Sequence, residues 1–295
     1  MHSSPGLVFP LENFKSPEDQ LRYAAKLIYG ALCFKRMIDT GALTPETMGK
    51  HPLDMSQYHK VFGTNRRPAP GRDELLYHPN SKHIVVAYKN YFFKIPVYTE
   101  SGEVLSPSQI LDMLNHIVNE TSGLSGAPVG VLTSDHRDTW ATVYQKLVKD
   151  KQNADSVKEI EEALFVVAID RPNRPLKSPK SGLADVEDEQ LSSRQTVAAL
   201  QMLHGNRTNS GNRWFDKTIN FVVGSEGECG LTYEHSPSEG PPIANTTDFI
   251  LNNLAKFESM LSNERAAPIF IPEKLPFNLE KLSSDITASF DTLGL

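Results

Sequence analysis

A run of seven consecutive apolar residues, from Ala163 to Ile169, constrains the fold more than any other stretch of this sequence. A strand with one face in solvent alternates apolar and polar residues, whereas a strand buried on both faces is apolar throughout. The run is therefore interpreted as a buried strand within a sheet. Helical and strand patterns are mixed along the rest of the chain, so we predict one large α/β or α+β domain with a mixed sheet.

Two predicted strand pairs extend this sheet. Residues 84–88 and 91–95 are apolar or aromatic except for Lys94, and Lys89-Asn90 between them predicts a two-residue hairpin turn. Residues 218–223 and 230–233 form a second predicted pair across a glycine-containing connection.

Capping patterns predict where two helices begin. Ser16 precedes a proline and two acidic residues, which suit the unpaired amides and the positive end of a helix N-terminus. Apolar residues then recur at helical spacing, at Leu21, Ala24, Ala25, Ile28, Leu32 and Cys33. Ser106 and Gln109 form a capping box ahead of a second apolar face, made of Ile110, Leu114, Ile117 and Val118.

Four further segments carry weaker signals. Thr44-Pro45-Glu46 favours a second, shorter helix, and Thr247 or Asp248 is expected to cap a later one. Residues 59–72 are rich in Pro, Gly and Arg and are interpreted as an irregular connection. Residues 171–191 contain three prolines and a charged cluster, and they are interpreted as an exposed loop.

Composition excludes several classes of protein. The chain has 295 residues, with 30 Lys and Arg against 36 Asp and Glu, so its formal net charge is −6. This balance argues against a nucleic-acid partner, because phosphate backbones attract clustered positive charge. Two cysteines, Cys33 and Cys229, are too few for a disulfide framework and favour an intracellular compartment. No apolar run approaches the roughly 18 residues that span a bilayer, and we see no targeting signal at the N-terminus.

The segment Tyr233 to Pro242 holds the strongest candidate for catalysis. His235 follows a predicted strand at a Pro- and Gly-rich corner, where a side chain is held by the sheet yet reaches its open edge. An imidazole can take and return a proton near neutral pH, so His235 is a candidate general base. Glu239 lies four residues further on and is expected to steady the site electrostatically.

Alternative interpretations compete with this one. His235 and Glu239 have the i, i+4 spacing of two metal ligands, but no Cys or His pair supplies the rest of a ligand shell, so we expect no metal. Residues 133–138 gather hydroxyl, imidazole and carboxylate groups, yet neighbouring residues on a loop point apart, and a capped loop before a helix is favoured there. Residues 224–227 lack the Gly-Lys-Ser/Thr ending of a phosphate loop and include a glutamate.

The residues around His235 resemble the choline/carnitine acyltransferase family. The matching residues run from Asn209 to Thr218, then Cys229-Gly230-Leu231 and Tyr233-Glu234-His235. The continuation Glu239-Gly240-Pro241-Pro242 is most similar to the carnitine acetyltransferase branch. Other segments that resemble the family are 21–28, Ser56-Gln57-Tyr58, 128–134 and, more loosely, 147–151.

The resemblance implies an enzyme that moves an acyl group between coenzyme A and the hydroxyl of carnitine or choline. It implies two similar α/β domains, each like chloramphenicol acetyltransferase, with the active site in a tunnel between them. The family's catalytic histidine corresponds to His235, and its nearby glutamate corresponds to Glu239. Coenzyme A or acetyl-coenzyme A is then a co-substrate rather than a bound cofactor. The resemblance also implies a mitochondrial or peroxisomal location and a monomer in the full-length form.

The family pattern is longer than this sequence. This sequence lacks three parts of the family pattern. They are a Ser-Thr-Ser segment, the basic residues that hold coenzyme A, and the residues that bind the carnitine carboxylate. We therefore expect residues 1–272 to form the domain with the catalytic histidine, and residues 273–295 to be a linker and the first helix of a second domain. Little acyl transfer is expected from the 295 residues alone. Two alternatives stay open: a non-catalytic acyltransferase-like fragment, and choline acetyltransferase activity.

Overall fold

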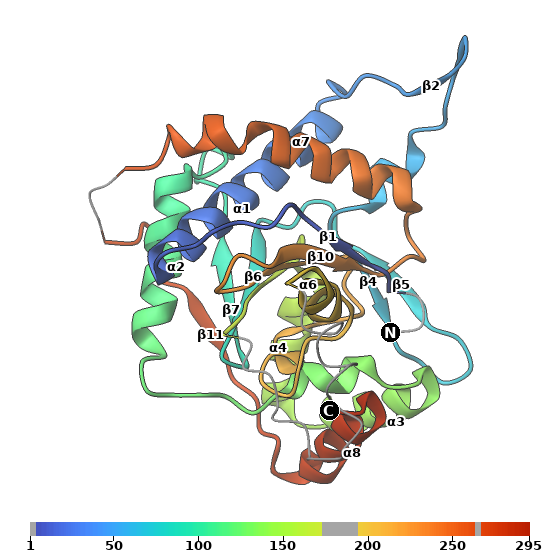
Figure 1. Ribbon diagram of the computed structural model, residues 1–295. Coiled ribbons are helices and arrows are strands. Elements are labelled where there is room, and N and C mark those ends of the chain that lie inside the picture. The colour runs from blue at the N-terminus through green and yellow to red at the C-terminus, as the bar shows by residue number, and fades with distance from the viewer. Residues whose placement is uncertain (1–3, 173–193, 263–266) are drawn as a thin grey trace, which may run out of the picture.

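A seven-stranded mixed sheet with helices on both faces organises the chain in the computed structural model, which describes residues 4–172, 194–262 and 267–295 (Figure 1). The strands lie side by side in the order β1-β10-β9-β8-β6-β7-β11. Their bounds are β1 (Gly6–Val8), β6 (His83–Tyr88), β7 (Tyr91–Pro96), β8 (Val166–Ile169), β9 (Ile219–Val223), β10 (Cys229–Tyr233) and β11 (Glu273–Leu275). The predicted mixed sheet is confirmed.

The predicted buried strand lies at the centre of this sheet. β8 pairs in parallel with β6 on one side and with β9 on the other, and all four of its residues are buried. Alternate residues of β6 face opposite cores: Ile84 and Val86 belong to one, and Val85 and Ala87 belong to the other. A strand covered on both faces exposes no residue to water, which explains its uninterrupted apolar sequence.

Helices form a layer on each side of the sheet (Figure 1). One layer contains α1 (Pro17–Asp39), α2 (Pro107–Glu120) and α7 (Gly240–Glu258), with α1 packed against the other two. The opposite layer contains α3 (Arg137–Leu147), α4 (Lys151–Glu162), α6 (Arg194–Leu203) and α8 (Ser283–Leu293). Among the described residues, no helix is both long enough and apolar enough to cross a membrane.

The predicted local signals hold at the first helices and at the hairpin. Ser16 accepts a hydrogen bond from the backbone amide of Asp19, whose carboxylate accepts one from the amide of Ser16, so the capping box is complete. Ser106 begins α2 in the same way. Lys89 and Asn90 have φ of 51° and 63°, as a two-residue turn between twisted strands requires.

Two helix predictions are wrong. Thr44 begins no helix; the two-stranded ribbon of β2 (Thr47–Met48) and β3 (His51–Pro52) follows instead, because a residue before proline disfavours helical backbone. α7 begins at Gly240 rather than at Thr247 or Asp248, because Pro241 and its neighbouring proline fit the first turn of a helix. The catalytic candidate thus lies directly before a helix.

Residues 59–72 are less irregular than predicted. A 3₁₀ turn, η1 (Ser56–Lys60), precedes β4 (Thr64–Arg67), which pairs with β5 (Glu74–Tyr77) in a separate two-stranded sheet. The arginines of β4 form ion pairs that sequence spacing does not reveal. Of the predicted loop 171–191, residues 173 onwards lie outside the described residues.

The last segment packs on the same sheet. β11 pairs antiparallel with β7, and α8 packs against η2 (Val129–Ser134). Further 3₁₀ turns are η3 (Ser210–Asn212) and η4 (Glu280–Leu282). Leu275, Ile286 and Phe290 join the core around Trp140. The boundary predicted between residues 272 and 273 stays a prediction.

Candidate active site

His235 lies on the short corner that joins β10 to α7. Tyr233 is the last residue of β10 and pairs with Ile219 of β9, and Gly240 is the first residue of α7. The corner therefore has a rigid strand on one side and a helix on the other. The His235 side chain is 39% exposed. Its position just beyond the end of β10 agrees with the strand ending that the sequence predicts.

The structure brings the two predicted site residues together. Nε2 of His235 lies 3.4 Å from Oε2 of Glu239. The ring of Tyr233 stacks on the imidazole, with ring centroids 5.6 Å apart and planes inclined by 28°. Burial raises the pKa of the Tyr233 hydroxyl, and the Glu239 carboxylate adds to that rise. The imidazole thus contacts an aromatic ring through its face and a carboxylate through Nε2.

Glu239 occupies the N-cap position of α7 but does not cap the helix with its side chain. That carboxylate, 64% exposed, is directed at His235 instead. The backbone amide of Glu239 donates to Oε1 of Gln57 at 2.9 Å. An acidic group beside a helix N-terminus is favoured by the helix dipole, so this position suits a carboxylate that faces the histidine.

The segment Ser56-Gln57-Tyr58 contacts both Glu239, the N-cap residue, and the body of α7. The hydroxyl of Tyr58 donates to Glu46, and the side-chain amide of Asn245 in α7 donates to the same carboxylate and to the Tyr58 oxygen. Burial, together with Glu46, raises the pKa of Tyr58 to about 12. This motif therefore contributes anchors for the helix that follows the histidine.

A network of partly and fully buried charges lies next to the corner, and sequence reasoning missed it. The carboxylate of Glu234 pairs with Nη1 of Arg66 at 2.9 Å, and Nε of Arg66 pairs with Asp73 at 2.7 Å. Asp73 also pairs with Arg137 at 2.8 Å, and Arg137 pairs in turn with Asp216. Four segments of the chain meet here, at residues 66–73, 137, 216 and 234, so no local motif identifies the network.

The two aspartates of this network have opposite shifts of pKa. Burial alone raises the pKa of Asp73, but hydrogen bonding and charge from Arg137, with Arg66, bring the net pKa below its usual value. Burial dominates at Asp216, whose pKa is raised to about 6 although Arg137 and the indole of Trp140 oppose the rise. Deep burial of Asp216 therefore outweighs its two partners.

The competing candidates are not assembled into a site. The hydroxyl of Ser134 donates to the carbonyl of Val131 at 2.6 Å, and Thr133 donates to Gly130 at 2.7 Å, so both are bound within their own turn. Residues 224–227 belong to the five-residue connection, 224–228, between β9 and β10. Across the part of the chain that the structure describes, no group of three or more His, Cys, Asp or Glu residues is placed to hold a metal ion.

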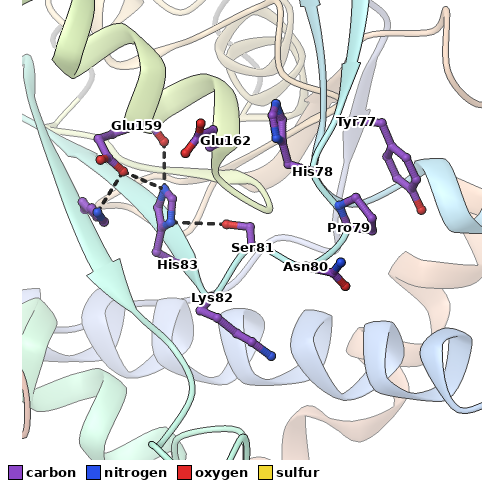
Figure 2. Close-up of a pocket in the computed structure, with 10 residues that line it drawn as sticks. Tyr77, His78, Pro79, Asn80, Ser81, Lys82, His83, Glu159 and Glu162 are labelled. Carbon is purple, nitrogen blue, oxygen red and sulfur yellow. Dashed lines mark hydrogen bonds and ion pairs between the residues drawn. The ribbon is translucent and has the colours of Figure 1, made fainter.

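A second histidine, His83, lines a pocket of about 470 Å³ at the start of β6, three strands from β10 and at the same end of the sheet (Figure 2). Nε2 of His83 donates to the backbone carbonyl of Glu159 at 2.8 Å, and the hydroxyl of Ser81 contacts Nδ1 at 3.2 Å. Both ring nitrogens therefore have partners. Burial lowers the pKa of His83, with smaller contributions from Lys94 and Lys217.

Known proteins resemble this chain over its whole length. Residues 1–293 match the family described as choline/carnitine O-acyltransferase. Carnitine O-acetyltransferases from Columba livia and Homo sapiens are 40% and 39% identical over 302 aligned positions, which cover all of this chain and 46% of each relative. Choline O-acetyltransferase from Mus musculus is 33% identical, across 94% of this chain and 42% of its own length. The chain spans about half the length of the curated relatives it matches.

Proposed function

The chain belongs to the choline/carnitine O-acyltransferase family, and from that premise we propose that it supplies the general base for acetyl transfer between coenzyme A and carnitine. The observation that carries the proposal is the half-exposed imidazole of His235, fixed against Glu239 and Tyr233 at the end of a sheet strand. Coenzyme A and carnitine are both substrates here, and the proposed chemistry uses no resident metal or cofactor.

The proposed step is direct transfer between the two substrates. His235 accepts the proton of the carnitine hydroxyl as that oxygen attacks the carbonyl carbon of the thioester. The carbon–sulfur bond then breaks, and the departing sulfur takes the proton back from the imidazolium. No acyl-enzyme is needed, because the two substrates react directly with each other. Orientation of the substrates and proton transfer supply the rate enhancement. In the reverse direction the same nitrogen removes the thiol proton of coenzyme A.

Glu239 is proposed to stabilise the imidazolium that forms during this step. Its carboxylate lies 3.4 Å from Nε2 of His235, close enough to attract the positive charge that the ring carries once it has taken the substrate proton. Because the Glu239 side chain is 64% exposed, water and salt screen this contribution. We therefore assign His235 the larger role and Glu239 the smaller one.

A second acceptor has a specific observation in its favour. Choline O-acetyltransferases also match the chain at 33–34% identity, close to the value for the carnitine enzymes. We favour carnitine on the higher identity and on the sequence Glu239-Gly240-Pro241-Pro242. By the same resemblance, we propose a mitochondrial or peroxisomal location and a monomeric full-length protein.

A chimera tests the proposal directly. In this chimera, the 295 residues replace the matching 46% of the carnitine O-acetyltransferase from Columba livia. The consumption of acetyl-coenzyme A is then measured with carnitine and, separately, with choline. We expect transfer to carnitine that the His235→Ala variant loses. Preference for choline would reverse the assigned acceptor, and full turnover by His235→Ala would end the assignment of the base. The same assay on the 295 residues alone tests whether they transfer little acetyl by themselves.

A further inference from the structure

Glu234 is bonded to the chain on both sides of the candidate base. Its own amide donates to the carbonyl of Thr218 at 3.0 Å, which ties it to the sheet. Its carboxylate accepts from the backbone amide of Ser236 at 2.9 Å and from the Ser236 hydroxyl at 3.0 Å. One side chain thus bridges the residues before and after His235, and the direction of the backbone at His235 is fixed.

Arg66 holds that carboxylate from the other side. The Glu234 side chain is only 3% exposed, and Nη1 of Arg66 lies 2.9 Å from its Oε1. The amide of Arg66 donates to the carbonyl of Asp216 at 2.8 Å, and its carbonyl accepts from Arg137 at 3.1 Å. Arg66 is therefore fixed at its backbone as well as at its guanidinium.

A buried ion pair at this point is costly unless it is fully hydrogen-bonded, and an apolar pair often gives equal stability. This pair, however, also holds the backbone turn at residues 234–236 through directional hydrogen bonds. Apolar packing has no such direction and would leave the turn less restricted. General bases require such restriction, because misplacement by about 1 Å lowers rates by roughly a hundredfold. We propose that Glu234 and Arg66 are positioning residues that set the direction of the His235 ring, an inference that rests on the proposed role of His235.

The same strand provides a matched control. Arg67, the next residue of β4, pairs with Glu161 at 2.5 Å, and the Glu161 side chain is also 3% exposed. Arg66→Met and Arg67→Met each remove one arginine from a pair with a buried glutamate. Only Arg66→Met removes a contact to the corner that carries His235.

Nuclear magnetic resonance of the 295-residue chain tests the proposal without any turnover. The variants Glu234→Gln, Arg66→Met and Arg67→Met are labelled at histidine Cε1, and amide hydrogen exchange is measured at Ser236. We expect exchange at Ser236 to rise about tenfold in Glu234→Gln, since a hydrogen bond to a charged group is weakened. In the first two variants the His235 ring resonance should shift as its stack on Tyr233 loosens. Arg67→Met should change neither signal.

Two further experiments distinguish a failure of the positioning role from a failure of the proposed function. Arg66→Lys retains a positive charge and should restore part of the wild-type His235 resonance; it also serves where Arg66→Met does not fold. In the chimera, Glu234→Gln should lower kcat at least tenfold with little change in KM. Unchanged Ser236 exchange and an unchanged His235 resonance in Glu234→Gln, or equal shifts in Arg67→Met, would overturn the positioning role. Full turnover by His235→Ala would instead overturn the proposed function.

Discussion

Two histidines lie next to strands of the same sheet, and they have opposite surroundings. His83 begins β6, with a side chain 10% exposed and both ring nitrogens in contact with neighbouring groups (Figure 2). His235 follows β10, with a side chain 39% exposed and one ring nitrogen facing an exposed carboxylate. A buried ring whose two nitrogens both have partners stabilises the fold. A partly exposed ring that packs on a neighbouring side chain is still accessible to a substrate.

The largest expected effect is a loss of turnover without a loss of stability when His235 is replaced. His235→Ala in the chimera should lower kcat by about 10² to 10⁴, the usual contribution of a general base. Its free energy of unfolding should change by less than about 0.5 kcal/mol, because the side chain is partly exposed and fills no cavity. Steady-state kinetics and urea titration measure the two quantities. Normal kcat, or a large loss of stability, would remove the contrast between the two histidines.

The second prediction concerns the stability that His83 supplies. His83→Ala should lower the free energy of unfolding by roughly 2–3 kcal/mol, since it removes a buried ring and leaves the carbonyl of Glu159 without this donor. Urea titration of the 295-residue chain measures the loss. Ser81→Ala is the milder control, because it removes only the hydroxyl partner of Nδ1. A His83→Ala variant as stable as the wild type would contradict the structural role.

A smaller effect is expected from the carboxylate beside His235. Glu239→Gln should lower kcat by less than about tenfold, because the charge that faces the imidazole is screened by solvent. The amide of residue 239 keeps its bond to Gln57, so the start of α7 should be unchanged. Kinetics at low and high salt provide the measurement, and the difference between variant and wild type should narrow as salt rises. A loss as large as that of His235→Ala would make Glu239 an equal partner.

The smallest effect is a dependence of stability on pH. Burial lowers the pKa of His83, and the positive charges of Lys94 and Lys217 lower it further. The hydrogen bond to the Glu159 carbonyl raises this pKa, but by less than burial lowers it. The unfolded chain therefore binds more protons at this position than the folded chain does. The contribution of His83 to the free energy of unfolding is fully present above the pKa of about 6.5 that the residue has in the unfolded chain. This contribution is lost as the pH falls through that value.

Unfolding experiments between pH 5 and 7.5 test this sign. One proton limits the slope to about 1.4 kcal/mol per pH unit. His83→Gln cannot titrate and should flatten the curve in that range. An equally steep curve in the variant would assign the pH dependence to other groups.

Local sequence determined the elements whose signals lie within a few residues. The apolar run at 163–169 contains β8, because a strand covered on both faces can expose no polar side chain. Ser16 and Ser106 began helices as predicted, since capping is a contact between near neighbours. The motif around His235, being contiguous, identified the candidate base and the family without any coordinates.

Only the tertiary structure decided what surrounds that base. The hairpin that holds Arg66 and Asp73 lies far in the sequence from Arg137 and Asp216, and long-range folding brings all of them close to Glu234. The sequence motif singles out His235, but it does not show that the His83 ring is 10% exposed and the His235 ring 39% exposed. Burial and hydrogen-bond partners distinguish the two rings, and these depend on which distant residues pack against each. Sequence therefore determined the local conformation and the chemical group, while tertiary packing determined its exposure and orientation.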